Sequence, residues 1–165
     1  MSKKVAVIMG SDSDLPVVRK AAEKLSELGI PYEMRVMSAH RTPREVTEFA
    51  VSARENGFGV IIAAAGKAAH LAGFIAANTT LPVIGVPLKS DALDGMDALL
   101  ATVQMPSGIP VATVAIDGTK NAAFLAVEIG AVSDPDLFQK YKAYREKAAK
   151  EIFEKDAKLQ KELGR

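Results

Sequence analysis

The chain has 165 residues, of which 48% are hydrophobic and 25% charged, with a formal net charge of +1 and no cysteine. The length suits a single domain with a sizeable core, and the near-neutral charge gives no reason to expect nucleic acid or an anionic membrane as a partner. The lack of cysteine excludes disulfides, thiolate metal sites and cysteine nucleophiles. No run approaches the ~20 apolar residues that span a bilayer, and residues 1–4 do not begin a signal peptide, so we expect a cytoplasmic protein.

Short apolar runs alternate with amphipathic helical patterns along the first 130 residues. The first run, residues 5–9, is apolar throughout, as in a strand covered on both faces, and a helix closed by Gly29 follows it. Four more strand–helix pairs follow, with strands expected at 32–37, 60–65, 81–86 and 110–116 and helices at 43–56, 68–78, 95–103 and 119–129. This alternation predicts a parallel sheet with right-handed crossovers. We expect an α/β fold, a three-layer doubly wound sheet of the flavodoxin-like kind, with strand order 2-1-3-4-5.

The tail departs from this rhythm. Residues 135–163 contain no glycine and only the proline that starts them, and their apolar residues recur close to helical spacing. Such a helix would be ~40 Å long, longer than a domain of this size is wide. We therefore expect one domain over 1–165, with a core at about 4–130 and a long C-terminal helix at about 134–163 that projects into oligomer contacts. The tail is basic, but its charges are mixed and its apolar stripe explains the helix without nucleic acid or a membrane surface.

Ligands of a parallel α/β sheet lie beyond the carboxyl ends of the strands, which makes the loops after the first four strands the candidate site. In the first loop, Gly10 precedes the hydroxyls of Ser11 and Ser13 at a helix N-terminus, a combination that favours anion binding. Asp12 and Asp14 would repel a phosphate placed on them. One of them is therefore either the helix cap or a carboxylate that binds sugar hydroxyls. The spacing matches neither the dinucleotide fingerprint nor a P-loop, and favours a mononucleotide-like ligand.

The second loop, residues 38–43, holds one of the two histidines of the chain. Histidine is the residue type suited to proton transfer at neutral pH, and the fixed cation Arg41 beside His40 suits an anionic ligand. Arg41 offers phosphate a two-pronged contact and Ser38 adds a hydroxyl. Thr42 and Pro43 start the next helix, so the loop is either a catalytic loop or only a helix cap.

The third loop is rich in small residues, among them Gly66 and Ala68, which let backbone approach a ligand closely. His70 is either a buried histidine satisfied by a backbone carbonyl or a pocket residue. The fourth loop, residues 87–90, is placed to close over a ligand. Two histidines far apart in sequence, without clustered carboxylates or thiols, make a weak metal site, and we expect no metal.

Several motifs occur in a fixed order along residues 4–130: MGSDSD (9–14), SAHRTP (38–43), AAHL (68–71), LPVIGVP (81–87), VQMP (103–106), GIPVATVAI (108–116) and NAA (121–123). Together they closely resemble the 5-(carboxyamino)imidazole ribonucleotide mutases of bacterial purine biosynthesis, which are class I of the PurE family. The resemblance implies a cofactor-free isomerase with a flavodoxin-like fold. It also implies a homo-octamer whose active sites lie at subunit junctions.

The implied reaction is part of de novo IMP biosynthesis and moves a carboxylate from the exocyclic nitrogen of an aminoimidazole ribonucleotide to ring carbon 4, by decarboxylation and recarboxylation. By motif position, His40 would be the general acid/base and His70 would line the same pocket. The residues that would bind the ribonucleotide, or assist in binding it, are Ser11, Ser13, Asp14, Ser38 and Arg41. A single imidazole can both deliver and remove the required proton near pH 7. The alanine-rich third loop would offer the freed carbon dioxide a small, dry cavity.

The resemblance fails at two positions of the third loop. Lys67 and Ala72 stand where these mutases usually have glycine and proline. Lys67 either points outward or touches the carboxylate or carbon dioxide. A basic residue in this loop is also similar to related carboxylases that use carbon dioxide directly, whereas the retained His70 favours a mutase. A third alternative is a nucleotide-phosphate sensor without catalysis, which would have no evident need of an imidazole at His40.

Overall fold

A computed structural model describes residues 3–164 of the protein. Five parallel strands form one sheet in the order β2-β1-β3-β4-β5, which confirms the predicted doubly wound, flavodoxin-like α/β fold. The strands are β1 (Lys4–Met9), β2 (Tyr32–Val36), β3 (Phe58–Gly66), β4 (Val83–Leu88) and β5 (Ala112–Thr113). The helices are η1 (Asp12–Asp14), α1 (Leu15–Glu27), α2 (Pro43–Ser52), α3 (Leu71–Ala76), α4 (Met96–Val103), α5 (Thr119–Ala131) and α6 (Pro135–Glu162).

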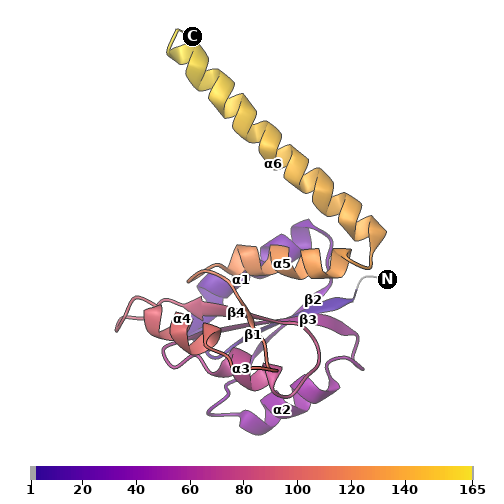
Figure 1. The fold of residues 1–165 in the computed structure, drawn as a ribbon, viewed down its shortest axis with the longest axis vertical. Helices are drawn as coiled ribbons and strands as arrows, with labels where there is room; N and C mark the ends of the chain where they lie inside the picture. The colour runs from indigo at the N-terminus through magenta and orange to yellow at the C-terminus, as the bar shows by residue number, and fades with distance from the viewer. Residues whose placement is uncertain (1–2, 165) are drawn as a thin grey trace.

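Helices cover both faces of the sheet (Figure 1), with α1 and α5 packed on one face and α2 and α3 on the other. Strand β1 supplies both cores, because Val5 and Val7 face α1 and α5 while Ala6 and Ile8 face α2 and α3. Burial on both faces explains why the strands read as continuous apolar runs. Helix α4 packs closely on β4, where a Cβ on Gly85 would lie 2.3 Å from Thr102 Cγ2.

Three elements are shorter than the sequence predicts by several residues. Helix α2 ends at Ser52 rather than at residue 56. Helix α3 begins at Leu71 rather than at residue 68, because tight turns hold the residues before it: Ala69 N donates to Lys67 O at 2.8 Å and His70 N to Ala68 O at 2.7 Å. Strand β5 has two residues rather than seven. It lies at the edge of the sheet, and Pro110 just before it has no N–H to donate to the ladder.

Helix α6 begins at a cap in which Asp134 Oδ1 accepts a hydrogen bond from Leu137 N at 3.0 Å. Its first turns pack on α5, where Leu137 is buried, and the rest projects away from the sheet (Figure 1), as predicted. The apolar side chains of its outer part are exposed: Ile152, Phe153, Leu159 and Leu163. Among residues 3–164, no helix combines the length and the apolar character that crossing a membrane would require.

Candidate active site

A cavity of about 630 Å³ opens at the carboxyl end of the sheet, between the loops that follow β1, β2, β3 and β4. The register of the sheet explains this meeting, because Met9 at the end of β1 pairs with Val36 of β2 on one side and with Ala64 of β3 on the other. The residues predicted to act in catalysis or to bind the substrate all line this one cavity: Ser11, Ser13, Asp14, Ser38, His40, Arg41, Gly66, Ala68 and His70.

The first loop is held by its own serines. Ser11 Oγ accepts hydrogen bonds from Ser13 N at 3.3 Å and from Ser13 Oγ at 2.9 Å, and so caps η1. Asp14 occupies the N-cap position of α1, as one interpretation expected, but its side chain makes no capping hydrogen bond. Its carboxyl faces the cavity, and burial raises its pKa above the ordinary value. A half-buried acceptor beside two hydroxyls is suited to hydroxyl groups of a ligand.

In the second loop, the side chain of Thr42 does not cap the following helix but binds the backbone at the start of the loop. The Thr42 hydroxyl accepts a hydrogen bond from Ser38 N at 2.9 Å and donates one to Ser38 O at 3.2 Å. Pro43 then begins α2, as predicted. Arg41 joins this loop to the first one, because its Nη2 donates to Gly10 O at 2.8 Å while its Nε donates to Ser38 Oγ at 3.4 Å. The two loops are thereby held at a defined spacing.

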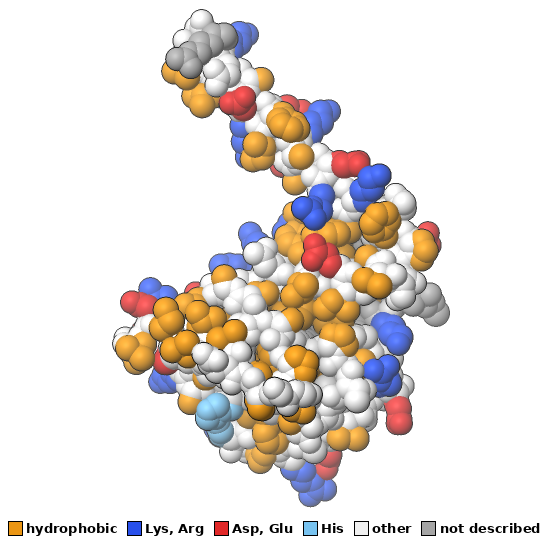
Figure 2. All heavy atoms as spheres, viewed as in Figure 1, with side chains coloured by type: hydrophobic (Ala, Val, Ile, Leu, Met, Phe, Trp, Pro, Cys, Tyr) orange, Lys and Arg blue, Asp and Glu red, His pale blue; other side chains and the backbone are white. Residues whose placement is uncertain are grey.

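The two histidines meet across the second and third loops. His40 Nε2 lies 2.8 Å from His70 Nδ1, and the rings stand edge to face with an interplanar angle of 81°. Both side chains are exposed and form one pale-blue patch in Figure 2, so His70 is not the buried histidine that one interpretation expected. One ring must donate and the other accept, which couples the tautomer of each imidazole to that of the other.

The third loop places Lys67 at a φ of 56°, in the left-handed region that glycine adopts freely and lysine does not. This explains why a glycine suits the position. The Lys67 side chain is exposed and lines the cavity. The fourth loop also reaches the cavity through Lys89, Ser90 and Asp91; Asp91 is an addition that no motif or spacing in the sequence singled out.

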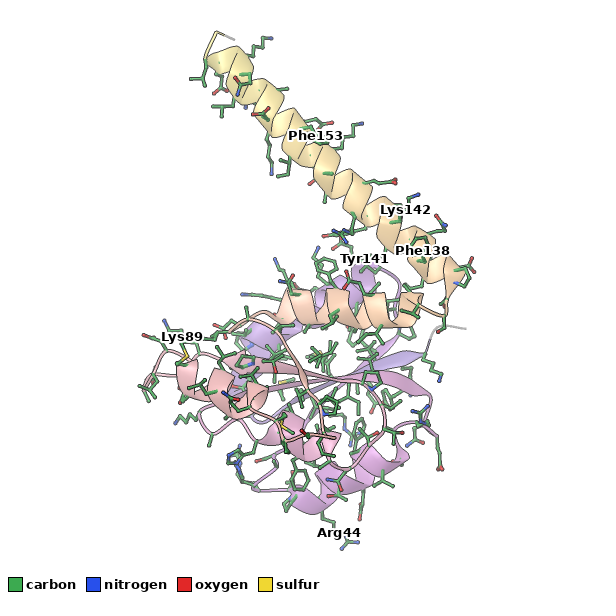
Figure 3. All side chains as sticks on the ribbon, in the orientation of Figure 1. Arg44, Lys89, Phe138, Tyr141, Lys142 and Phe153 are labelled. Atoms are coloured by element: carbon green, nitrogen blue, oxygen red, sulfur yellow. The ribbon has the colours of Figure 1, made fainter. Side chains whose placement is uncertain are left out.

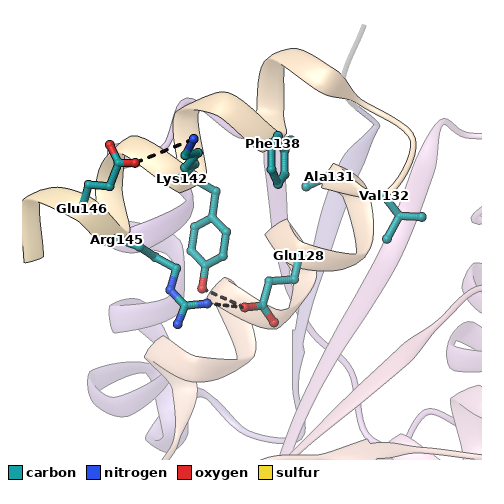
Figure 4. A pocket seen from close by; sticks show the side chains of 8 residues that line it. Glu128, Ala131, Val132, Phe138, Lys142, Arg145 and Glu146 are labelled. Atoms are coloured by element: carbon teal, nitrogen blue, oxygen red, sulfur yellow. Dashed lines mark hydrogen bonds and ion pairs between the residues drawn. The ribbon is translucent and has the colours of Figure 1, made fainter. Parts of the chain in front are cut away.

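Two further findings concern the rest of the described chain. Within residues 3–164, no three His, Asp or Glu side chains gather as a metal site would need. A second cavity of about 680 Å³ lies between α5 and α6 (Figure 4). Its lining residues follow both histidines by more than 50 positions in the sequence. It has apolar walls that include Val132 and Phe138, and a polar edge where Tyr141 Oη donates to Glu128 Oε1 at 2.9 Å.

Comparison with known proteins decides the family. Residues 4–151 match the family described as AIR carboxylase. The chain belongs to this family. Its relatives include the N5-carboxyaminoimidazole ribonucleotide mutase of Pyrococcus horikoshii, which is 56% identical over 160 residues that make up 97% of this chain and 90% of that protein. The mutase of Thermotoga maritima is 53% identical over 157 residues, covering 95% of this chain and 92% of that protein.

A solved structure agrees with this assignment. The crystal structure of Treponema denticola PurE superposes with a TM-score of 0.85 at 34% identity, covering 95% of this chain and 98% of that one. The likeness extends over nearly the whole chain, including most of α6. Because the Pyrococcus relative is archaeal, the resemblance is broader than the bacterial family that the motifs indicated.

Proposed function

We infer that the protein is an N5-carboxyaminoimidazole ribonucleotide mutase, an isomerase of purine biosynthesis. The observation that carries the proposal is the cavity in which the His40–His70 pair lies beside the serine loop and Arg41. The carboxylase that gives the family its description is the alternative enzyme. The mutase is favoured because relatives more than 50% identical over nearly the whole chain bear that name.

The first two loops bind the ribonucleotide in this proposal. The hydroxyls of Ser11, Ser13 and Ser38 line the cavity. One N–H of the Arg41 guanidinium donates to Gly10 O, and the group has further N–H donors that can bind a ligand. These donors suit a 5′-phosphate. The Asp14 carboxyl, on the same side, accepts hydrogen bonds from ribose hydroxyls.

The third loop and His40 serve the carboxyl transfer. When the N–C bond to the carboxylate breaks, carbon dioxide leaves with that bond's electrons remaining on nitrogen, which takes a proton. When carbon 4 attacks carbon dioxide, its own proton must leave to restore the aromatic ring. His40 supplies the first proton and receives the second, so the net reaction neither gains nor loses a proton. Gly66 and Ala68 leave room for carbon dioxide between the two steps.

We further propose a homo-octamer whose subunits complete the cavity. His40, Arg41 and His70 are exposed in the single chain, whereas the released carbon dioxide must be kept from water and from escape. Exposed apolar side chains support contacts between subunits. They form a stripe at helical spacing on and before α4, visible as an orange cluster in Figure 2: Leu93, Met96, Leu100 and Val103. The outer part of α6 and the cavity in Figure 4 expose further apolar side chains.

A cytoplasmic location belongs to the same proposal, because a phosphorylated ribonucleotide is made and used inside the cell. The function is tested by giving the pure protein N5-carboxyaminoimidazole ribonucleotide without bicarbonate or ATP. We expect the carbon-4 carboxylate to form. Formation only from aminoimidazole ribonucleotide with high bicarbonate would establish the carboxylase instead, and ligand binding without either product would establish a sensor.

A further inference from the structure

We propose that Lys67 is a specificity-determining residue that binds the carboxylate transferred in the reaction. This inference rests on the proposed function, since it concerns the two anionic groups of that substrate. It assigns a role to a residue at which this chain departs from the motif of the mutases it resembles.

The cationic side chains around the cavity differ in the partners that they have within the protein. Three cationic side chains line it. Arg41 is tied to Gly10 O and to Ser38 Oγ, and Lys89 forms an ion pair with Asp94 at 3.0 Å (Figure 3 labels Lys89). Among the ion pairs of residues 3–164, none involves Lys67. Neither Arg41 nor Lys67 is neutralised by a carboxylate of the described residues, so both charges are left for the two anionic groups of the ligand.

The position of Lys67 decides which anionic group it meets. Arg41 and the serines belong to the first two loops, where they suit the phosphate. Lys67 belongs to the third loop, in the turn that also holds His70, and His70 contacts His40. Lys67 therefore stands on the same loop as the partner of the proton-transfer residue, on the side of the cavity where the proposed reaction requires the carboxylate. A lysine suits this group because its compact charge attracts a carboxylate without requiring one fixed orientation.

The backbone supplies an independent observation. The φ of 56° at Lys67 is unfavourable for a lysine, and hydrogen bonds from Ala69 N to Lys67 O and from His70 N to Ala68 O hold the turn. Strained backbone of this kind concentrates where a side chain has a function.

Equilibrium binding in a His40→Asn background tests the proposal, because this background prevents turnover during the titration. We expect Lys67→Asn to weaken binding of the carbon-4 carboxylated ribonucleotide about tenfold and binding of aminoimidazole ribonucleotide, which lacks the carboxylate, less than twofold. Asparagine tolerates the left-handed conformation, so the variant removes the charge without adding strain. Lys67→Gly should match Lys67→Asn, and Lys67→Arg should retain most of the difference between the two ligands.

The matched control is Lys20→Asn, which removes one exposed positive charge on α1 away from the cavity and should change neither affinity. Equal weakening for both ligands in Lys67→Asn would overturn the proposal, since it would place Lys67 on the phosphate. No weakening for either would overturn it as well, since the side chain would then point outward. Mutase turnover by the wild-type protein distinguishes a failure of the proposed function from a failure of the role of Lys67. Without turnover the proposed function fails. If turnover occurs but the Lys67 variants affect both ligands equally, only the role of Lys67 is refuted.

Discussion

His40 Nε2 and His70 Nδ1 lie 2.8 Å apart, so the two imidazoles share one hydrogen. When His40 gives up or takes a proton at its other ring nitrogen, the partner can adjust its own tautomer in response. We propose that His70 positions His40 in this way, although the two stand on loops after different strands.

The role of His70 is tested by two replacements of different shape. Asparagine places an amide near the position of Nδ1 and can keep the contact with His40, whereas leucine cannot. We expect His70→Leu to lower kcat by about 10²-fold or more, within the range of acid–base catalysis, and His70→Asn to cost less than that, about tenfold, with little change in ribonucleotide affinity. Steady-state kinetics together with equilibrium binding measures both. Equal losses in the two variants would contradict a role through the hydrogen bond.

The hydroxyl of Thr42 predicts a stability effect coupled to activity. Thr42→Val keeps the shape but leaves Ser38 N–H without its acceptor, which should cost about 1–3 kcal/mol of unfolding free energy. Because the same contact closes the loop that carries His40, kcat should fall as well. Thr42→Ser retains the hydroxyl and is the control, with both quantities near wild type. Urea unfolding and kinetics decide; a stable, fully active Thr42→Val would show that the loop needs no such closure.

Much of this arrangement could be predicted from the sequence, because it depends on local patterns. Apolar runs alternating with helical periodicity indicate a parallel sheet, and parallel strands bring their following loops to one edge, which is why His40 and Ser11 share a cavity. The hydrogen bond between His40 and His70 could not be predicted, since it depends on the relative placement of two loops to within an ångström. The left-handed backbone conformation of Lys67 could not be predicted either, because nothing in the residue type requires it.

Asp14 predicts a conflict between stability and function that depends on pH. Burial raises the pKa of its carboxyl above the ordinary 3.8, so its ionised form opposes folding. The penalty is absent below the unfolded pKa and is present in full above the raised, folded pKa. Asp14→Asn should therefore raise Tm at pH 7, and the gain should shrink as the pH approaches 3.8. Asp12→Asn, at a more exposed position, is the control and should shift Tm less.

The same Asp14→Asn variant should bind the ribonucleotide more weakly, because an amide accepts fewer hydrogen bonds from the ribose hydroxyls than a carboxylate does. Thermal melts across pH and equilibrium binding measure the two effects. A Tm gain that stays constant down to low pH would show that burial of the charge is not its cause.

The projecting helix α6 predicts a separation of folding from assembly. Phe153 is 72% exposed and, as Figure 3 shows, lies well beyond the α5–α6 junction marked by Phe138 and Tyr141. Phe153→Asp should leave the fold of the single chain intact but break the subunit contacts proposed above. Light scattering with chromatography should show smaller species with a native circular dichroism spectrum. Lys155→Asp, which changes charge on the same helix without removing an apolar side chain, is the control. A wild-type monomer at micromolar concentration would refute the assembly outright.

The central claim is that the cavity around His40 and His70 transfers a carboxylate within one ribonucleotide. The most direct measurement follows ¹³C placed in the N-carboxylate of the substrate, with the pure protein in solution depleted of bicarbonate. We expect the label to appear at the carboxylate on carbon 4 with wild-type protein but not with His40→Asn, which should still bind the ribonucleotide. Loss of the label to solution without labelled product, or full transfer by His40→Asn, would contradict it.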